Sequence, residues 1–385
     1  MRRALILLPE APYPVIGGGP LRTASIIEAL APQFQLTAIH YQLAGDPDPA
    51  TLYPPNLLHQ SHTLPLPQHA KSTIPKILRN LNRALRGIPP LVDRFAGHEA
   101  ALHQILTNQN YDLIWVEHFW AATYAPLLKQ HASKLVLNLH NIEHAYYDSL
   151  AATSPLLHRP LLQHFAQKAR AYEAHLLPHF HLLLTTSQQD KDRIAHPNIQ
   201  VLPNTIPWHD LPTQPKSESL VFTGNFAYTP NQQALHWFLE NCWPSLLKAK
   251  PNLRLRLVGK EIHYAHSSHP NIDYIGPVPD AIVEIAKSRL AIVPLLSGSG
   301  TRLKILEAWA AGTPVVSTPL GAEGLDATPG QHLQIAKSPG DFTQTILDLF
   351  DNEIGRSRIT QSARNLYETS YTWQTARKIL SELDL

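Results

Sequence analysis

The stretch "LLSGSGTRLKILEAWAAGTPVVSTPLGAEGL", residues 295–325, contains a glycine-rich loop, a helix expected over Leu303–Ala311 and a strand expected over Pro314–Ser317. The first amides of a helix have no partner within the helix, and the helix dipole favours an anion beside them. Gly298 and Gly300 let the backbone approach a phosphate closely. The loop therefore predicts a phosphate site, and an ordinary loop with solvated charges is the alternative.

Charged residues at the start of this helix favour the first interpretation. Arg302 and Lys304 add positive charge beside the loop, and Glu307 could accept hydrogen bonds from sugar hydroxyls. The stretch lacks the Gly-Lys-Ser/Thr of a Walker A loop. We therefore expect a ligand that carries both a phosphate and a sugar.

Short apolar runs alternate with amphipathic segments along the whole chain, which predicts parallel sheets with helices on both faces. The strands expected in the first half are Ala4–Leu8, Leu36–Tyr41, Leu113–Val116, Leu135–Leu139, Leu182–Thr186 and Ile199–Leu202. Those in the second half are Leu220–Thr223, Leu253–Val258, Ile272–Tyr274 and Ala291–Pro294. The other helices expected are Leu21–Leu30, Glu99–Leu106, Leu161–Leu177, Asn231–Leu247, Ala281–Ala286 and Phe342–Phe350.

A proline-rich segment, residues 202–219, interrupts this alternation. The expected fold class is therefore α/β, with two Rossmann-like doubly wound domains that face each other across a cleft. The first domain is expected over residues 1–205, a hinge over 206–219 and the second domain over 220–368. In open α/β sheets ligands bind beyond the carboxyl ends of the strands, so the cleft is the expected site.

The composition excludes several classes of protein. With 385 residues the chain exceeds one ordinary core, and a formal charge of +2 gives no reason to expect a nucleic-acid partner. Cys242 is the only cysteine, so neither an internal disulfide nor a cysteine metal site is expected. The apolar run Ala4–Leu8 is too short for a secretory signal, and no run reaches the roughly 18 residues of a membrane span. We expect a cytoplasmic protein.

Six motifs together resemble one enzyme family. They are "YPVIGGGPLR" (13–22), "LNLHN" (137–141), "LLLTTSQQDKDRI" (182–194), "VLPNTI" (201–206), "FTGNFAYTPN" (222–231) and "EAWAAGTPVV" (307–316). The set resembles the GT-B glycosyltransferases, specifically the large retaining family called GT4 or glycosyl transferases group 1. The resemblance covers the whole chain and implies that a helix in residues 369–385 crosses back to the first domain.

The resemblance also implies roles for individual residues. In the second domain, Glu307 would bind the ribose hydroxyls of a nucleotide sugar, the amides of Gly300 and Thr301 would hold its diphosphate, and Arg302 or Lys304 would neutralise it. The further donor-binding residues expected there are Gly224, Asn225, Gly259, Val278 and Ser299. In the first domain, Gly18 and Gly19 would approach the phosphate or the transferred sugar, and His140 would lie beside the reacting sugar.

Two positions depart from the family pattern. Ser299 stands where the family has its first glutamate, and a hydroxyl binds a sugar more weakly than a carboxylate does. Asn225 and Pro230 stand where the family has an arginine and a lysine. We expect Arg302 and Lys304 to compensate for that missing charge.

Other candidate residues keep two interpretations. Glu117 and His118 follow a strand and either contact the acceptor or face water, and a histidine such as His140 can simply cap a loop. Residues 46–48, "DPD", would make a weak metal site and are expected to be a solvated loop. His175, His179 and His181 have metal-like spacing but no evident acidic partner. No metal site and no cofactor are expected.

Residues 71–87, "KSTIPKILRNLNRALRG", form a basic amphipathic segment without an acid. Such a helix can lie on an anionic membrane, which would imply a lipid-linked acceptor at the inner face of a membrane. Alternatively, it covers the core of the first domain and presents a solvated basic face.

The leading hypothesis is a metal-independent glycosyltransferase that uses a UDP- or GDP-sugar, retains the donor's anomeric configuration and builds a polysaccharide or glycoconjugate. Its acceptor would be a glycan, a lipid-linked sugar or a small molecule. The alternatives are a nucleotide-sugar epimerase and a degenerate GT-B protein that only binds nucleotide sugars.

Overall fold

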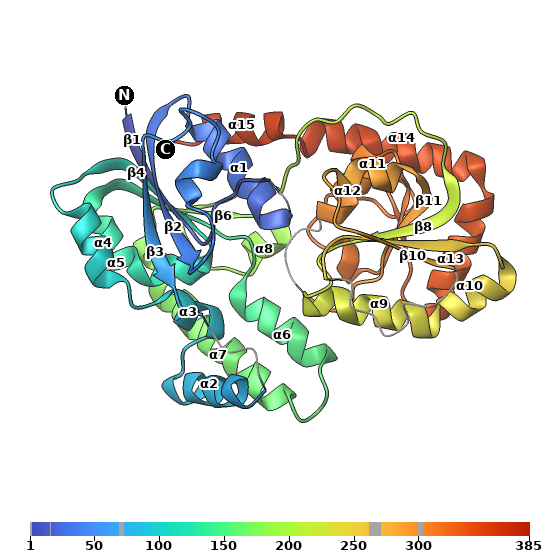
Figure 1. Ribbon diagram of the computed structural model, residues 1–385, viewed down its shortest axis with the longest axis horizontal. Coiled ribbons are helices and arrows are strands. Elements are labelled where there is room, and N and C mark those ends of the chain that lie inside the picture. The colour runs from blue at the N-terminus through green and yellow to red at the C-terminus, as the bar shows by residue number, and fades with distance from the viewer. Residues whose placement is uncertain (1, 16, 69–72, 262–270, 299–302) are drawn as a thin grey trace. The chain divides into compact units, whose positions relative to one another are not determined.

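The computed structural model describes residues 2–15, 17–68, 73–261, 271–298 and 303–385. It divides into two compact units (Figure 1). The first unit comprises Met1–Pro203 together with Ala376–Leu385, and the second comprises Asn204–Thr375. The two units are described separately below.

Over the described residues, the first unit contains a seven-stranded parallel sheet in the order β3-β2-β1-β4-β5-β6-β7. Its strands are β1 (Arg2–Leu8), β2 (Phe34–Leu43), β3 (Gln60–Leu66), β4 (Tyr111–Glu117), β5 (Ala132–Asn138), β6 (Leu182–Thr185) and β7 (Ile199–Val201). Most are continuous apolar runs, because helices cover both faces of the sheet. The edge strand β3 was not predicted, since its sequence, QSHTLPL, is largely polar and contains a proline, which edge strands tolerate.

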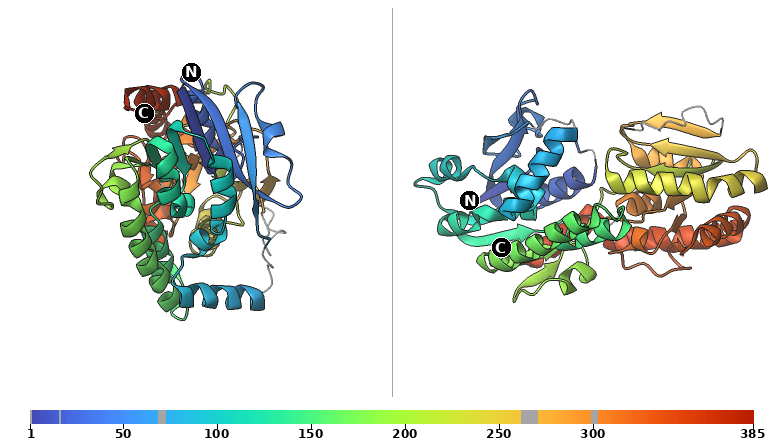
Figure 2. Two further views of the ribbon diagram at one scale, coloured as in Figure 1. Left: turned by 90° about the vertical axis from the view of Figure 1, so that its left-hand side faces the viewer. Right: turned by 90° about the horizontal axis from the view of Figure 1, so that it is seen from below.

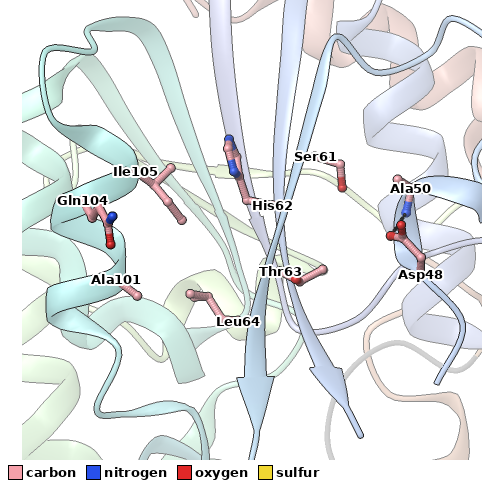
Figure 3. Close-up of a pocket in the computed structure, with 9 residues that line it drawn as sticks. All are labelled: Asp48, Ala50, Ser61, His62, Thr63, Leu64, Ala101, Gln104 and Ile105. Carbon is pink, nitrogen blue, oxygen red and sulfur yellow. Dashed lines mark hydrogen bonds between the residues drawn. The ribbon is translucent and has the colours of Figure 1, made fainter. Parts of the chain in front are cut away.

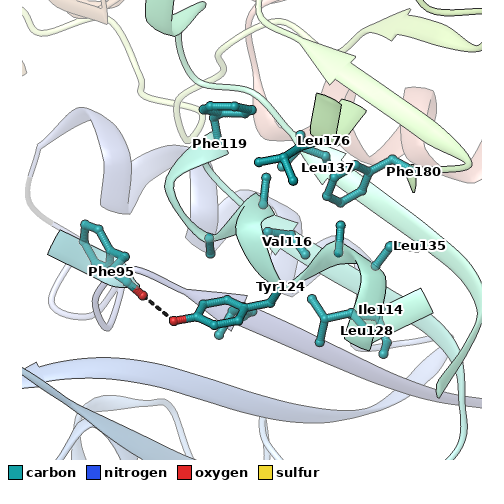
Figure 4. Packing of buried hydrophobic residues seen from close by; sticks show 14 of the residues in the cluster. Phe95, Ile114, Val116, Phe119, Tyr124, Leu128, Leu135, Leu137, Leu176 and Phe180 are labelled. Carbon is teal, nitrogen blue, oxygen red and sulfur yellow. Dashed lines mark hydrogen bonds between the residues drawn. The ribbon is translucent and has the colours of Figure 1, made fainter. Parts of the chain in front are cut away.

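Successive side chains of the central strands enter different cores on the two faces of this sheet. Leu5 and Leu7 of β1 pack in one cluster, and Ala4, Ile6 and Leu8 pack in the other. Figure 4 shows the first cluster, in which the hydroxyl of Tyr124 donates to the Phe95 carbonyl at 2.6 Å. The helices of this unit are α1 (Gly18–Leu30), α2 (Thr73–Arg86), α3 (Pro90–Phe95), α4 (Glu99–Leu106), α5 (Ala125–Leu128), α6 (Glu143–Thr153), α7 (Arg159–Leu176) and α8 (Gln188–Asp192).

The end of the chain is part of this first unit. Helix α15 (Trp373–Glu382) brings Ala376 and Leu380 into the cluster that also contains Ala4, and Leu385 joins them. The guanidinium of Arg377 donates to Glu28 of α1 at 2.9 Å. Figure 1 shows α15 beside α1 and near the N-terminal strand.

Over its described residues, the second unit contains a six-stranded parallel sheet in the order β10-β9-β8-β11-β12-β13. Its strands are β8 (Ser217–Thr223), β9 (Arg254–Val258), β10 (Ile272–Gly276), β11 (Ser288–Val293), β12 (Val315–Ser317) and β13 (Gln334–Ile335). Its helices are α9 (Thr229–Asn241), α10 (Trp243–Ala249), α11 (Ala281–Ala286), α12 (Leu303–Ala310), α13 (Pro339–Asp351) and α14 (Glu353–Ser370). Figure 2 shows helices on both faces of each sheet, which confirms the predicted α/β architecture.

One predicted helix is divided in the structure. The sequence predicts a single helix over Asn231–Leu247, whereas α9 ends at Asn241 and α10 begins at Trp243. Pro244 lies in the first turn of α10. Proline has no amide hydrogen to continue a helix, but it suits the start of a new one.

Candidate functional site

Two glycines bring the ends of β8 and β9 into close contact in the second unit. A Cβ atom on Gly259 would lie 1.8 Å from the carbonyl oxygen of Gly224, so the backbones leave no room for a side chain. The φ of Gly259 is 139°, in the region that favours glycine. The two glycines therefore form a backbone surface without side chains at the carboxyl edge of the sheet.

Helix α12 places Lys304 at this surface. The Lys304 ammonium donates to the Asn231 side-chain oxygen at 2.7 Å and lies 4.7 Å from the centre of the Phe222 ring. A Cβ atom on Gly224 would lie 3.3 Å from Lys304 Nζ, so this ammonium adjoins the end of β8. The expectation that Lys304 supplies charge near this strand end therefore has a geometric basis.

Asn231 is a site residue that sequence analysis missed. Its side chain is 7% exposed, and its amide donates to the carbonyl of Asn225 at 2.8 Å while its oxygen accepts from Lys304. It thereby fixes the loop after β8 and orients the lysine. Its place at the end of "FTGNFAYTPN" was the available signal.

Glu307 lies one turn further along α12 and is partly buried. Burial raises its pKa to about 7, although Lys304 acts in the opposite direction and Asp280 adds to the rise. Within the described ranges, which omit residues 299–302, no group donates a hydrogen bond to this carboxylate. The second unit therefore presents a desolvated carboxylate that an external hydroxyl group could satisfy.

Other predicted donor-side residues have varied positions. Val278 is partly buried in the turn before α11, and Asp280 in the same turn caps α11 by accepting from Ile282 at 2.8 Å. Ser299, Gly300, Thr301 and Arg302 lie outside the described residues, so their predicted roles stay predictions.

In the first unit, Glu117 and His140 form a buried pair at the ends of β4 and β5. Glu117 Oε2 lies 2.5 Å from His140 Nε2. The indole of Trp115 donates to Glu117 Oε1 at 2.7 Å, and the Asn138 amide donates to both carboxylate oxygens. Glu117 is 1% exposed, so the alternative that it faces water is wrong, because three neighbours enclose its carboxylate.

His118 is the centre of a stack of rings. Its ring lies 3.6 Å from that of His140 and 4.2 Å from that of Trp120, measured between ring centres. Trp120 in turn stacks on Phe95 at 5.3 Å. His118 has a φ of 66°, which is unusual for a residue with a side chain and turns the imidazole into this stack.

Arg22 and Glu143 are two further polar residues that sequence analysis did not single out. Arg22 is 2% exposed and donates to the Asn138 side-chain oxygen at 2.5 Å and to the Leu202 carbonyl at 2.7 Å. Glu143 begins α6, and burial raises its pKa to about 7, while its Oε2 accepts from Trp120 at 3.2 Å. Both lie inside quoted motifs or directly after one, which was the available signal.

Gly18 and Gly19 are the first residues of α1, after Gly17 with a φ of 97°. A Cβ atom on Gly19 would lie 3.8 Å from a carboxylate oxygen of Glu10. The two glycines that are predicted to approach the phosphate or the transferred sugar therefore lie at the N-terminus of a helix in the first unit.

A surface hollow beside β3 contains none of the predicted site residues (Figure 3). It is lined by Asp48, Ala50, Ser61, His62, Thr63, Leu64, Ala101, Gln104 and Ile105. Across the described part of the chain, no group of three or more His, Cys, Asp or Glu residues is arranged to hold a metal ion. The rings of His175 and His179 are 6.1 Å apart.

Helix α2 has an unexpected orientation. Arg83 is buried and bonds Asp93 of α3 at 2.8 Å, and Arg86 bonds the same carboxylate at 2.9 Å. The apolar residues instead face outward, with exposures of 54% to 81% for Ile74, Ile77, Leu78, Leu81 and Leu85. The alternative of a helix that covers the core with its apolar face is therefore wrong, because its apolar residues are exposed and Asp93 holds Arg83 inward. Arg86 pairs with the same carboxylate but remains 52% exposed.

The described part of the chain offers no helix that is both long and apolar enough to cross a bilayer. The remaining basic residues of residues 71–87 are Lys71, which lies outside the described residues, Lys76 and Arg79.

Comparisons with known proteins agree with this architecture. Residues 217–352 match the family model described as glycosyl transferases group 1. An uncharacterized 44.6 kDa protein in the cps region of Klebsiella pneumoniae is 25% identical over 298 residues, which cover 73% of this chain and 76% of that protein. Sucrose-phosphate synthase from Thermosynechococcus elongatus superposes with a TM-score of 0.71 at 15% identity, covering 99% of this chain and 98% of its own. HepE from Anabaena, solved with UDP, gives 0.67 at 16% identity, with 99% and 98% covered.

These similarities confirm the resemblance to GT-B glycosyltransferases. The chain has the GT-B fold, and the match over residues 217–352 identifies a group 1 glycosyltransferase domain in its second unit. The enzyme class predicted from the motifs is thereby confirmed.

Proposed function

We propose that this protein, whose residues 217–352 match the group 1 glycosyltransferases, transfers a sugar from a UDP- or GDP-sugar to a glycan, lipid-linked or small-molecule acceptor. The reaction would retain the donor's anomeric configuration, need no metal ion and serve polysaccharide or glycoconjugate synthesis. The UDP and UDP-glucose complexes of HepE support a nucleotide-sugar donor. The place of the Klebsiella pneumoniae relative in the cps region supports the polysaccharide assignment.

The observation that carries this proposal is the pairing of Lys304 and Glu307 on α12. Lys304 Nζ adjoins Gly224 at the end of β8, where it can neutralise a diphosphate. Glu307 is a desolvated carboxylate with a raised pKa, and the two hydroxyls of a ribose would supply the donors that it lacks among the described residues. Cation and carboxylate thus match the two ends of one nucleoside diphosphate.

In the proposed reaction, the bond between the sugar C1 and the diphosphate oxygen breaks, and the electron pair leaves with the nucleoside diphosphate. An acceptor hydroxyl oxygen forms the new bond to C1, and its proton passes to the departing diphosphate. Preorganised positive charge lowers the barrier to such a departure. Lys304 supplies that charge, and the amides of the loop before α12 would add to it.

The donor proposal is tested by measuring release of UDP or GDP from candidate sugars with wild type and Glu307→Ala. We expect Glu307→Ala to abolish turnover, whereas Glu240→Ala on the exposed side of α9 leaves it intact. Full turnover by Glu307→Ala would contradict the proposal. A thermal-shift screen across nucleotide sugars identifies the donor, since a ligand of the native state raises the melting temperature.

The remaining parts of the proposal have separate tests. The anomeric configuration of the product, read by proton NMR, decides retention. Turnover in EDTA decides whether a metal ion takes part. Release of nucleotide only when an acceptor is present would distinguish transfer from epimerisation, which needs no acceptor.

The outward apolar face of α2 supports a membrane-associated acceptor. Its five exposed apolar residues match the apolar layer of a lipid surface, and the sequence of residues 71–87, which has five basic residues and no acid, matches an anionic one. Leu156 and Leu157 in the turn before α7 are also exposed, at 76% and 88%. We therefore propose peripheral binding to an anionic bilayer through α2.

Co-sedimentation with vesicles tests this binding. Wild type is expected to sediment with vesicles of phosphatidylglycerol and phosphatidylcholine, and the double variant Leu78→Glu, Leu81→Glu to remain in solution. Ile354→Glu is the control, because Ile354 is an exposed apolar residue of α14, at 84%, outside α2. Failure of wild type to sediment, or an equal loss in the control, would refute the membrane proposal and leave the donor proposal untouched.

A further inference from the structure

We infer that Glu117 is a positioning residue that holds His140 with its proton on Nε2, so that Nδ1 is the acceptor nitrogen for a substrate hydroxyl. This inference rests on the proposed function and on the prediction from the sequence motifs that His140 lies beside the reacting sugar. It concerns a buried side chain that would not touch the substrate itself.

The orientation of the Asn138 side-chain amide determines which groups around Glu117 donate hydrogen bonds and which accept them. Arg22 can only donate, and it contacts Asn138 Oδ1 at 2.5 Å, so the Asn138 amide nitrogen must point the other way. That nitrogen lies 3.0 and 3.2 Å from the two oxygens of Glu117. The Asn138 amide nitrogen is therefore a hydrogen-bond donor to the Glu117 carboxylate, and the contact with Arg22 prevents the amide from turning its oxygen toward Glu117.

The same argument applies to Trp115, whose indole can only donate and reaches Glu117 Oε1 at 2.7 Å. Burial raises the pKa of Glu117, whereas His118, Arg22 and the hydrogen bonds from Trp115 and Asn138 act in the opposite direction. Because fixed donors face both of its oxygens, the geometry favours the ionised carboxylate. His140 Nε2 lies 2.5 Å from Glu117 Oε2 and 3.3 Å from the Asn138 amide nitrogen. The shorter contact, to the carboxylate, is the stronger hydrogen bond, and Nε2 donates it.

His140 itself is held in its neutral form and in one plane. Burial keeps the pKa values of His140 and His118 well below the usual value, and the nearby charge of Arg22 acts in the same direction on both groups. The stack of His118 on Trp120 supports one face of the His140 ring. A neutral imidazole with its proton on Nε2 has a lone pair on Nδ1, which can accept a hydrogen bond from a hydroxyl group.

Glu117→Gln is the variant that tests this role. Glutamine offers one carbonyl oxygen for the two donors, Trp115 and Asn138, and its amide group then faces His140 Nε2. Because that amide donates, the imidazole must accept at Nε2 and carry its proton on Nδ1. The ring would therefore turn from an acceptor into a donor toward the substrate.

A matched pair elsewhere in the unit provides the control. Glu173 of α7 lies 2.5 Å from His144 Nδ1 of α6 and is 7% exposed, so it repeats the chemistry of Glu117 at a different place. Glu173→Gln should change the ring of His144 and leave turnover unchanged.

The experiment combines nitrogen-15 NMR of histidine-labelled protein with kinetics. His140 is assigned by comparison with His140→Gln. We expect the Nε2-protonated tautomer in wild type and the Nδ1-protonated tautomer in Glu117→Gln. The kcat of Glu117→Gln should fall about tenfold to hundredfold, with less than a twofold change in the Kd for UDP or GDP.

Three results would overturn the inference: an Nδ1-protonated His140 in wild type, an unchanged kcat in Glu117→Gln after the tautomer has switched, or an equal loss of kcat in Glu173→Gln. The wild-type spectrum alone decides the first point even if Glu117→Gln does not fold. If wild type turns over no nucleotide sugar, the proposed function fails, whereas the tautomer assignment still stands.

Discussion

Replacing Glu307 by glutamine should stabilise the ligand-free protein at pH 8 and weaken its binding of nucleotide. Burial raises the pKa of this carboxyl from 4.5 to about 7. One pKa unit corresponds to about 1.4 kcal/mol, so keeping the carboxylate ionised in the folded protein costs up to about 3 kcal/mol. Glutamine carries no charge and avoids that cost.

The sign of the pH dependence follows from the two pKa values. Between pH 4.5 and pH 7 the folded protein binds more protons at Glu307 than the unfolded chain does, so this residue's contribution to stability falls as the pH rises. The glutamine variant lacks this loss. Its stability relative to wild type should therefore rise between pH 4.5 and pH 7 and stay constant above pH 7.

Thermal melts of wild type and Glu307→Gln at pH 5 and pH 8 measure this difference. For a unit of this size, 1 kcal/mol shifts the melting temperature by about 2–4 °C. The variant should therefore gain several degrees relative to wild type between the two pH values. Glu240→Gln is the control, since Glu240 is 59% exposed and pairs only with His236 among the described residues.

Nucleotide binding should change in the opposite direction. Calorimetric titration at pH 8 should show a loss of about tenfold to hundredfold in affinity for UDP or GDP, because the charged hydrogen bonds to the ribose are lost. A difference in melting temperature that is the same at pH 5 and pH 8 would refute the burial argument. An unchanged nucleotide affinity would refute the proposed role of Glu307.

Three further predictions concern other parts of the second unit. Lys304→Ala should weaken the binding of nucleoside diphosphate about tenfold to hundredfold in a calorimetric titration, because it removes the cation beside Gly224. The affinity for the nucleoside without phosphate should stay unchanged. Gly259→Ala should lower the melting temperature strongly or prevent folding, since its Cβ would overlap the Gly224 carbonyl, whereas Gly340→Ala, with open space around it, should not. Cys242 is buried and its thiol pKa is raised to about 11, so a thiol reagent should modify it only after unfolding in urea.

Much of the fold could be predicted because buried parallel strands are continuous apolar runs. The cores of β4 and β5 follow directly from such runs in the sequence. Strand β3 and helix α14 were not predicted, because neither shows a clear apolar period: β3 is half polar, and α14 begins EIGRSR. Short or polar elements form because neighbouring elements bury one face of them, and that information is not local.

The proximity of candidate site residues could be predicted only where the residues belong to the same helix. Lys304 and Glu307 belong to the same turn-and-a-half of α12, so their proximity follows from the helix period. Asn231 is 73 residues from Lys304, and Arg22 is 116 residues from Asn138. Such contacts depend on strand order and helix packing. The inward turn of Arg83 toward Asp93 is a further case, because an amphipathic pattern does not say which face meets the protein.

The contribution of Ala376–Leu385 to the first unit has a consequence for how the protein is made. A ribosome completes residues 204–375 before it reaches the segment that fills the remaining gap beside Ala4. The second unit can therefore finish folding first, while the core cluster of the first unit still lacks Leu380 and Leu385. Expression of residues 1–203 alone would leave that cluster without Ala376, Leu380 and Leu385, so we expect a fragment of the first unit to be more stable when residues 376–385 are included.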